Sequence, residues 1–572
     1  MAGVTVTRAA VASRLGVDPR RWTGLAVFGG FALLAFVYLG VRLLVDPGDQ
    51  YLGVGSDPLG FVWCFGWWPY AIAHGENPFV THAIWAPNGV NLIWTASVPG
   101  LALLFSPLTV VAGPVFSYNV ATVLLPAFAA WTAFVLCRHL TRALWPSLVG
   151  GYLFGFSSYE LGEEVGHPHV TAVFLIPLVV LVCVRFVEGE LDGRGLVLRL
   201  GPLLGFEFLI STEVTFTLGL ALVSSVALGA ALLPPRRQRL VAMLAPLVGA
   251  AAFAALLTAP FVYYAVTGFQ RGAVTPVGFF TTDLYNFAIP TRITLVSFRW
   301  AVPIANHFPG NNSERGAYLG VPALLIIALF FWSRARRASG RFLLAALTLA
   351  VVCTLGFRLT IEGHASVWLP WSLVGHWPLF DNVLPERLSM YVALLGAVIV
   401  SLWTAARRSG VLRWLLPGLA MLAILPNPNA HQWASRYTVP AFFTDSAYRT
   451  CLDPNENILP LPVTAGGESM LWQAMGGYRF RMAGGNIEPD PPRSFLAPTA
   501  IANIAWGSSL PANQLGELEA YIQAKHVTSV LVDPSMLTQW SPALDRIASP
   551  ELLGGVVVYH ISDDSPSCLG AS

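Results

Sequence analysis

The feature that constrains this chain most is a series of apolar runs, each close to the length that a helix needs to cross a bilayer. A helix spans the hydrocarbon core with about 20 residues. The runs occupy residues 22–45, 117–137, 144–158, 169–187, 196–211, 214–233, 240–265, 317–333, 342–357, 388–406 and 413–426. We therefore expect an all-α polytopic membrane bundle of about eleven transmembrane helices.

The arginines support this arrangement, because positive charge stays on the cytoplasmic side of a membrane. If the residues before the first run are cytoplasmic, the next cytoplasmic loops contain "CRHLTR", "EGELDGRG", "PPRRQR", "SRARRASGR" and "RRSGVLR". Every arginine cluster in a short loop then falls on one side. The remaining segments are expected outside, at residues 46–116, 159–168, 266–316, 358–387 and 427–572.

One apolar stretch, residues 98–113, does not fit this series. It is short and carries Pro99 and Pro107, and a span here would move Arg138 and Arg142 to the outside. We interpret it as an interfacial or re-entrant segment.

Composition agrees with a membrane protein and argues against a nucleic-acid partner. Of the residues, 55% are apolar and 11% are charged, whereas soluble domains carry about 25% charged residues. A net charge of +2 is too small to indicate nucleic-acid binding. Lipid is therefore the expected environment, and the expected location is the plasma membrane with a cytoplasmic N-terminus.

The chain changes character after Pro426, which divides it into three parts. Residues 1–21 form the cytoplasmic N-terminus, and residues 22–426 form the membrane domain. Residues 427–572 contain the strand patterns "NILPLPV", "VTSVLVDP" and "GGVVVYHIS" and the helical pattern "PANQLGELEAYIQAKH", which predict an extracytoplasmic α/β domain. The sequence leaves open whether its flanking Cys451 and Cys568 form a disulfide.

The first outer loop, residues 46–116, combines the acids Asp49 and Asp57 with many tryptophans. Tryptophan favours the headgroup region, where one part of the ring is apolar and another is wet. We therefore expect the loop to lie on the membrane as short helices. Within "SDPLGF", Ser56 or Asp57 suits an N-cap and Pro58 the first helical position. Asp57 is thus either a cap or a catalytic base or metal ligand. The tryptophans are Trp63, Trp67, Trp68, Trp85 and Trp94.

The second outer loop, "SSYELGEEVGHPHV", is dense in ionisable residues between two apolar runs. Its candidates are Glu160, Glu163, Glu164, His167 and His169. The histidines with a carboxylate suit a divalent metal, and they also suit a phosphate contact. The alternative is a set of interfacial residues with satisfied hydrogen bonds.

A third candidate is the helix start "DNVLPERLSMYV", where Glu386 and Arg387 stand at the outer end of a span. Helix N-termini favour anions, and the forked donors of Arg387 match a phosphate. The alternatives are a snorkelling arginine or a local pair with Glu386. Glu207 and Glu213 flank a hairpin turn, and Glu213, expected near the outer surface, is a weaker candidate. A further group in the loop at 266–316 has no spacing that indicates chemistry, namely Asp283, Arg292, Arg299, His307, Glu314 and Arg315.

Together these features resemble the GT-C superfamily of membrane glycosyltransferases, which use polyprenyl-phosphate sugars. The segments "GENPFVTHAIWAPNGVNL", "FGFSSYELGEEVGHPHVTAVFLIPLVVL" and "LPWSLVGHWPLFDNVLPERLSMYVAL" are similar to bacterial multispanning proteins described as YfhO-like or as uncharacterised glycosyltransferases. The resemblance extends over residues 22–430. It implies a GT-C-like bundle with an outer α/β domain.

The resemblance also implies roles for individual residues. The acid of the GT-C first loop falls on Asp57, with Asp49 the other choice. The second-loop "GH" falls on Gly166 and His167, and the helix start falls on Arg387. Some GT-C enzymes have a tight acidic pair in this loop, whereas Asp49 and Asp57 are eight residues apart.

The expected function is transfer of a sugar from a lipid-linked polyprenyl-phosphate donor to a cell-envelope acceptor on the outer face, with inversion. Asp57 would be catalytic. The expected substrate- and phosphate-binding residues are Asp49, Glu163, Glu164, His167, His169, Glu386 and Arg387. A divalent metal is possible. The rivals are a transporter or flippase of a lipid-linked saccharide, and a non-catalytic glycan-binding scaffold. Transporters favour repeated halves and mid-membrane charge, which this sequence lacks.

Overall fold

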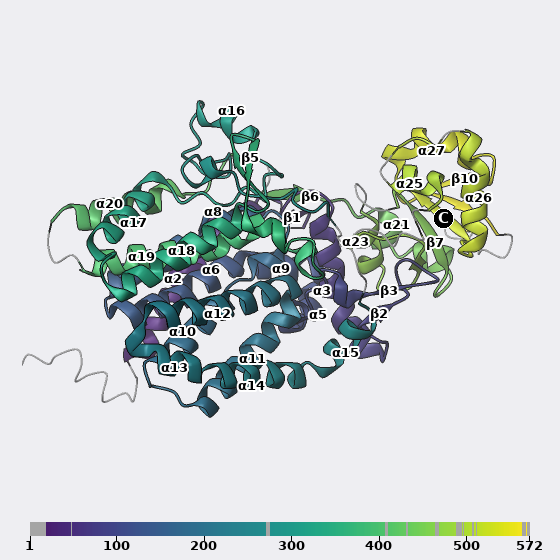
Figure 1. Ribbon diagram of the computed structural model, residues 1–572. Helices are drawn as coiled ribbons and strands as arrows, with labels where there is room; N and C mark the ends of the chain where they lie inside the picture. Colours follow the sequence, from purple (N-terminus) through teal and green to yellow (C-terminus); the bar gives the residue numbers. More distant parts are fainter. Residues whose placement is uncertain are drawn as a thin grey trace, which may run out of the picture.

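The fold is known from a computed structural model (Figure 1). The structure describes residues 19–562 and Cys568, except residues 47, 270–274, 407–409, 431–432, 464–467, 488–494, 496, 506–507 and 511. The predicted cytoplasmic N-terminus up to residue 18 and the arginines at 407 and 408 lie outside the described residues.

A bundle of helices makes up the larger part of the molecule, and each expected apolar run overlaps at least one of them. α7 packs between α6 and α19, and α11 packs on α14. The helices are α2 (Pro19–Tyr38), α6 (Pro114–Thr141), α7 (Leu144–Gly155), α10 (Leu175–Val187), α11 (Gly193–Ile210), α12 (Thr212–Leu232), α13 (Arg237–Ala242), α14 (Leu244–Leu257), α15 (Ala259–Thr267), α17 (Val321–Arg334), α18 (Ala338–Thr354), α19 (Ser389–Ala406) and α20 (Leu412–Ala423).

Five helical segments of the described chain are long and apolar enough to cross a membrane. They are Pro114–Thr141, Pro168–Val187, Thr212–Leu232, Pro234–Leu257 and Pro385–Ala406. Shorter apolar helices accompany them, so the predicted number of eleven spans stays a prediction. Residues 98–113 form α4 (Pro99–Leu104) and α5 (Ser106–Ala112), and neither reaches the length of a span.

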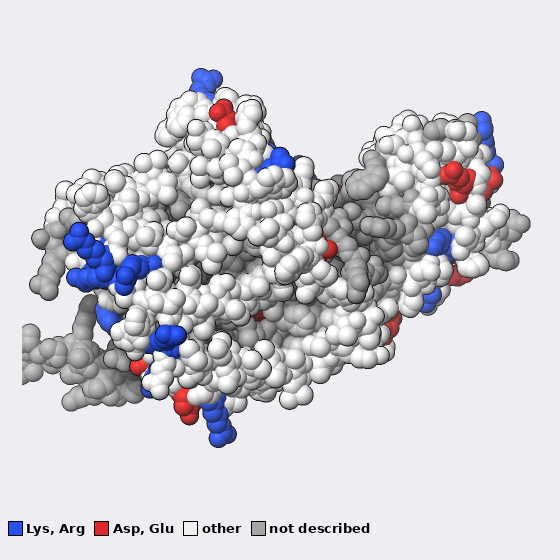
Figure 2. All heavy atoms as spheres, viewed as in Figure 1, with Lys and Arg blue, Asp and Glu red and all other residues white. Residues whose placement is uncertain are grey.

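Charged side chains are unevenly distributed over the bundle. Figure 2 shows Lys and Arg gathered at the end of the helices that lies opposite the C-terminal part, with few charges over the long middle. An apolar belt with cationic groups at one end is the pattern that a membrane imposes.

The C-terminal part contains a five-stranded mixed sheet in the order β10-β11-β9-β7-β8. β7 (Asn457–Leu461) is parallel to β8 (Arg481–Met482) and β9 (Ser529–Val532), and β11 (Val556–His560) is antiparallel to β9 and to β10 (Pro550–Leu553). Its helices include α23 (Ser469–Met475), α25 (Thr499–Ala505), α26 (Leu515–Ala524) and α27 (Leu537–Leu544).

A disulfide joins two distant ends of this part. Cys451, the last residue of α22 (Tyr448–Cys451), is bonded to Cys568. The sequence alone left open whether these two cysteines pair.

The first outer loop is built differently from the prediction. It contains the long helix α3 (Asp57–His74) and a small hairpin of β2 (Val80–Thr81) and β3 (Val90–Asn91). β1 (Gln50–Leu52) pairs with β6 (Ala434–Arg436). α3 is buried along most of its length and packs on α23 of the C-terminal part.

The predicted half-wet tryptophans are therefore wrong for this loop. Trp63, Trp67, Trp68 and Trp85 are at most 2% exposed. Trp67 and Trp68 donate to the carbonyls of Pro78 and Ser97 within the same loop. Trp63 donates to Gln473 Oε1 at 2.6 Å. Burial inside protein replaces the bilayer interface as the environment of these rings.

The proposed topology predicts which surface sites meet the outside. In a background without free cysteines, Glu519→Cys on α26 should react with a membrane-impermeant maleimide in intact cells. Glu190→Cys, in a predicted cytoplasmic loop, should react only after permeabilisation. Both positions are exposed. Labelling of both in intact cells would contradict the topology.

Candidate functional site

The start of α3 is held against the second outer loop by main-chain hydrogen bonds. Val54 N donates to Val165 O at 2.8 Å, and Gly53 N donates to Trp433 O at 3.0 Å. Three segments that are far apart in sequence thus meet just before Asp57.

Asp57 occupies the first turn of α3, where the N-terminal helix dipole favours a carboxylate. Ser56 takes the N-cap position without a side-chain capping bond, and Pro58 follows Asp57. The Asp57 side chain is 39% exposed, so this acid reaches solvent while its helix is buried.

His167 links Asp57 to the buried part of the site. Its Nε2 lies 3.6 Å from Asp57 Oδ2, and its Nδ1 lies 2.8 Å from Glu163 Oε2. Glu163 ends α8 (Ser158–Glu163), and His167 is four residues later. The imidazole is therefore held between one exposed and one fully buried carboxylate.

Arg387 continues this chain of charges into the protein. Its Nη1 donates to Glu213 Oε2 at 2.6 Å, and its Nη2 donates to Glu314 Oε1 at 2.7 Å. Its Nε also lies 3.7 Å from Glu163 Oε1. The side chain is 9% exposed. Glutamates occupy its forked donors in this arrangement, and a phosphate contact of Arg387 stays a prediction.

Glu314 reaches the site from the loop between α15 and α17, which sequence reasoning did not connect with chemistry. The loop packs closely on α8, since a Cβ on Gly162 would lie 2.6 Å from Ser313 O. Asn311 Oδ1 accepts from the main-chain N–H groups of Ser313 and Glu314. A glycine at 162 thus permits the contact, but no spacing in the sequence indicates it.

Two further predicted residues, Glu386 and Glu164, make no hydrogen bond to Arg387 or His167 among the described contacts. Glu386 accepts from Gly316 N at 2.8 Å and from Ser389 Oγ at 3.3 Å, so the predicted local pair with Arg387 is absent among the described contacts. Glu164 is buried, and neither of its carboxylate oxygens has a hydrogen-bond partner within the described chain.

The last two predicted residues lie in different surroundings. His169, in α9 (Pro168–Thr171), stacks on Phe61 with ring centroids 5.5 Å apart. Asp49 is exposed just before β1, where its carbonyl accepts from Tyr437 N. Asp57, Glu163, His167 and Arg387 thus form one network, which Asp49 does not join.

The buried charges perturb one another. Burial and the nearby Glu314 raise the pKa of Glu163 to about 7, against Arg387 and His167, which lower it. Burial lowers the pKa of His167, but the Asp57 and Glu163 carboxylates raise it well above its ordinary value. Burial raises the pKa of Glu314, but Arg387 and His167 bring it below its ordinary value. His167 is therefore held as an imidazolium.

Glu163, His167 and Glu314 also offer donor atoms of the kind that bind a divalent metal. These atoms lie within 4.8 Å of one another, and carboxylate with imidazole suits several transition metals. The guanidinium of Arg387 already lies against both carboxylates, and two cations repel strongly in a buried site. The arrangement of Glu163, His167 and Glu314 therefore does not fit a metal ion.

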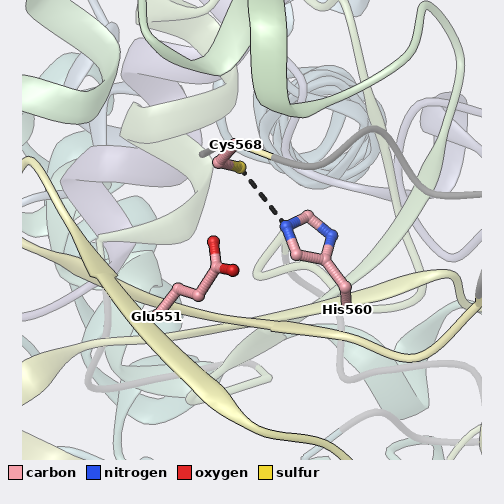
Figure 3. Close-up of side chains that lie close together, drawn as sticks. All are labelled: Glu551, His560 and Cys568. Atoms are coloured by element: carbon pink, nitrogen blue, oxygen red, sulfur yellow. Dashed lines mark hydrogen bonds between the residues drawn. The ribbon is translucent and has the colours of Figure 1, made fainter. Parts of the chain in front are cut away.

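A second set of donor atoms, from Glu551, His560 and Cys568, lies in the C-terminal part (Figure 3). His560 Nε2 is 3.3 Å from Cys568 Sγ. The disulfide to Cys451 removes the thiolate that a metal would require. This set is therefore a structural contact.

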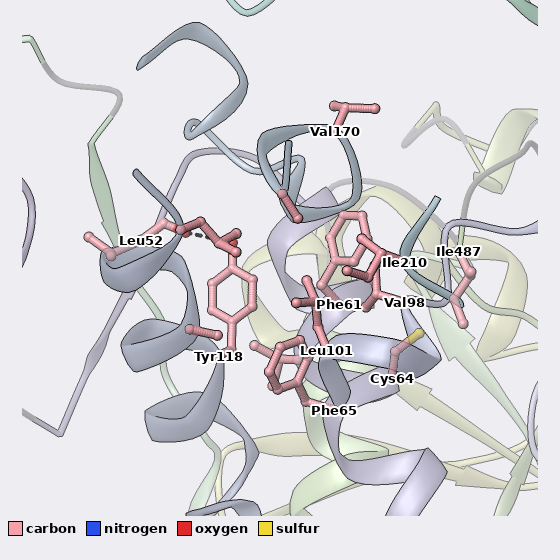
Figure 4. Packing of buried hydrophobic residues seen from close by; sticks show 14 of the residues in the cluster. Leu52, Phe61, Cys64, Phe65, Val98, Leu101, Tyr118, Val170, Ile210 and Ile487 are labelled. Carbon is pink, nitrogen blue, oxygen red and sulfur yellow. Dashed lines mark hydrogen bonds between the residues drawn. The ribbon is translucent and has the colours of Figure 1, made fainter. Parts of the chain in front are cut away.

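A small cavity that is open to solvent adjoins Asp57. Its lining residues come from α3, from the segment before α4 and from the C-terminal part, and they are Asp57, Gly60, Phe61, Ala96, Asn486 and Ile487. Figure 4 shows Phe61 and Ile487 within the surrounding apolar cluster. The site thus combines an exposed acid, an imidazolium behind it and a cavity in front of it.

The fold is that of the GT-C glycosyltransferases. The mycobacterial arabinofuranosyltransferase AftD matches with a TM-score of 0.57 and 13% identity, over 96% of this chain and 40% of AftD. The apo oligosaccharyltransferase of Archaeoglobus fulgidus matches with a TM-score of 0.52 and 13% identity, over 95% of this chain and 75% of that enzyme. The chain thus spans two fifths of the length of AftD.

Sequence comparison places the chain in one family. Residues 27–425 match the family described as a domain of unknown function (DUF6311), and the protein belongs to that family. No curated protein matches its sequence.

The Arg387 network predicts that removing a buried ion pair lowers stability far more than removing an exposed one. Arg387→Ala leaves Glu213 and Glu314 without their cation, which costs about 3–5 kcal/mol for a buried pair. We expect a marked fall in melting temperature in lipid nanodiscs. The control is Arg185→Ala, which breaks the exposed 2.8 Å pair with Glu190 and should leave the melting temperature nearly unchanged. Equal effects would contradict the role of Arg387.

The raised pKa values predict that stability falls as pH rises. Glu163 has a folded pKa of about 7 against an ordinary 4.5, so its stabilising proton is present below 4.5 and lost as pH rises through 7. His167, also raised, acts in the same direction above its ordinary 6.5. Each proton contributes at most about 1.4 kcal/mol per pH unit.

The measurement is the melting temperature between pH 5 and pH 8. Wild type should become less stable towards pH 8, and Glu163→Gln should flatten this dependence. Glu519→Gln, on the exposed face of α26, should follow wild type. A profile of Glu163→Gln as steep as that of wild type would refute the assignment.

Proposed function

We propose that this protein is an integral-membrane glycosyltransferase that moves a sugar from a polyprenyl-phosphate donor to a cell-envelope acceptor. The observation that carries the proposal is Asp57, an exposed acid at the start of a buried helix, facing a cavity in a chain with the GT-C fold. The reaction takes place on the outer face, with the N-terminus cytoplasmic and residues 427–572 outside.

Asp57 acts as the general base. An acceptor hydroxyl within about 2.6–3.2 Å of its carboxylate gives up its proton as the oxygen attacks the anomeric carbon of the donor. The bond between that carbon and the phosphate oxygen breaks, and polyprenyl phosphate leaves with the electron pair. One displacement inverts the anomeric centre.

His167 positions Asp57 for this step. Its imidazolium lies 3.6 Å from Asp57 Oδ2 and holds the carboxylate at the edge of the buried network. Glu163, bonded to the other ring nitrogen, orients the imidazole. Arg387 neutralises the buried glutamates behind them, so its contribution is structural and it makes no contact with the donor.

The donor's lipid would lie among the membrane helices, because its isoprenoid chain is apolar. The acceptor would approach from the C-terminal side, where the cavity opens between α3 and the segment around Asn486. The two substrates thus reach Asp57 from opposite directions.

The test is transfer from a panel of radiolabelled polyprenyl-phosphate sugars to extracted cell-envelope acceptor, with the full chain in nanodiscs. Asp57→Asn keeps the shape but removes the base, so transfer should fall by about 10²–10⁴-fold with an unchanged melting temperature. Asp49→Asn is the matched control, because Asp49 is exposed in the same loop outside the network, and it should retain activity. Donor binding without turnover in any form would favour a carrier or a scaffold instead.

A further inference from the structure

The wall of the cavity opposite α3 comes from the C-terminal part, and its position is fixed by main-chain contacts. Gly485 N donates to Val463 O at 3.0 Å, and Trp85 N donates to Gly484 O at 3.0 Å. The segment around Gly484 is therefore tied both to the end of β7 and to the first outer loop.

The next residue, Asn486, is pressed against α3 by its main chain. A Cβ on Gly60 would lie 2.6 Å from Asn486 O, so the segment touches α3 one turn after Asp57. Ile487, 8% exposed, anchors it in the apolar core.

The side chain of Asn486 is free to act in the cavity. It is partly exposed, it lines the same cavity as Asp57, and no hydrogen bond to another described residue engages its carboxamide. A carboxamide offers two N–H donors and a carbonyl acceptor, which together match the neighbouring hydroxyls of a sugar. Ile487 and Phe61 add an apolar surface beside it.

We propose that Asn486 and Ile487 form the acceptor subsite, in which the Asn486 carboxamide hydrogen-bonds a saccharide hydroxyl next to the one that reacts. This rests on the proposed function, since Asp57 must touch the acceptor hydroxyl to remove its proton. A molecule that reaches Asp57 in this cavity meets Asn486 on the other wall. On this proposal the acceptor is a glycan that the C-terminal part of the chain contacts.

The chemistry gives this subsite a role in specificity. A site that hydrogen-bonds a substrate hydroxyl discriminates strongly against an analogue without it, because the polar group of the site is then left unpaired. An acceptor that lacks the hydroxyl beside the reacting one should therefore be a poor substrate.

The test is Asn486→Ala in the full chain in nanodiscs, with extracted cell-envelope glycan as acceptor and the polyprenyl-phosphate sugar that supports turnover. The acceptor KM should rise about tenfold, which corresponds to about 1.4 kcal/mol, while kcat and the donor KM change less than twofold. Asn503→Ala is the matched control, because Asn503 is also partly exposed in the C-terminal part but pairs with Gln514. It should keep wild-type values.

Two results would overturn the subsite: an acceptor KM as unaffected as in Asn503→Ala, or a donor KM that rises as much as that of the acceptor. A separate binding measurement distinguishes this from failure of the proposed function. Asp57→Asn and the double variant with Asn486→Ala are titrated with the same glycan. Weaker binding by the double variant supports the subsite even if no donor turns over, and equal binding refutes it.

Discussion

The structure depends on one buried cation, the guanidinium of Arg387. It joins Glu213 of α12, Glu314 of the loop before α17 and Glu163 at the end of α8. Four segments that are far apart in the chain thus converge on one planar group, whose five donors can satisfy several carboxylates at once. A lysine, with a single point of charge, would not hold the same geometry.

The charge of Arg387 influences the protonation of the carboxylates around it. Buried carboxylates are costly unless they are paired or protonated, and here the glutamates outnumber the cations. Arg387 and the His167 imidazolium neutralise part of this charge, while burial, and after it the nearby Glu314, raises the pKa of Glu163. Asp57, at the edge of the network, is thereby left as the acid that faces solvent. The buried residues of the site, Arg387 and its glutamates, stabilise the structure, whereas Asp57 at its edge is accessible for chemistry.

The sequence indicated the residues of the first and second outer loops better than the residue that reaches the site from the loop before α17. Asp57, Glu163 and His167 were identifiable because they are polar groups in short segments between apolar runs. Glu314 was not, because its loop approaches α8 through a close contact at Gly162 that leaves no periodic signal. Arg387 was identified as a phosphate-binding candidate, but its glutamate partners were not, since charge alone does not say which acidic groups of the protein will lie against it.

The prediction that the tryptophans lie at the membrane interface was wrong for a related reason. An amphipathic ring satisfies its N–H equally well at a membrane surface or against a buried amide, and composition cannot separate the two. For Trp63, the buried partner is Gln473, from a helix more than 400 positions further along the chain, which accepts the indole N–H. The helices themselves were predictable, since apolar runs of this length have few alternatives.

The bond between Cys451 and Cys568 has a consequence for how this protein matures. Its cysteines are 117 positions apart, and a closed loop of about 100 residues restricts the unfolded chain by about 4–5 kcal/mol. Every strand of the five-stranded sheet lies within that loop, so the bond can form only after the whole sheet has been synthesised. The wall that carries Asn486 belongs to the same loop. The disulfide therefore restrains the segment that carries this wall only once Cys568 has been synthesised and oxidised.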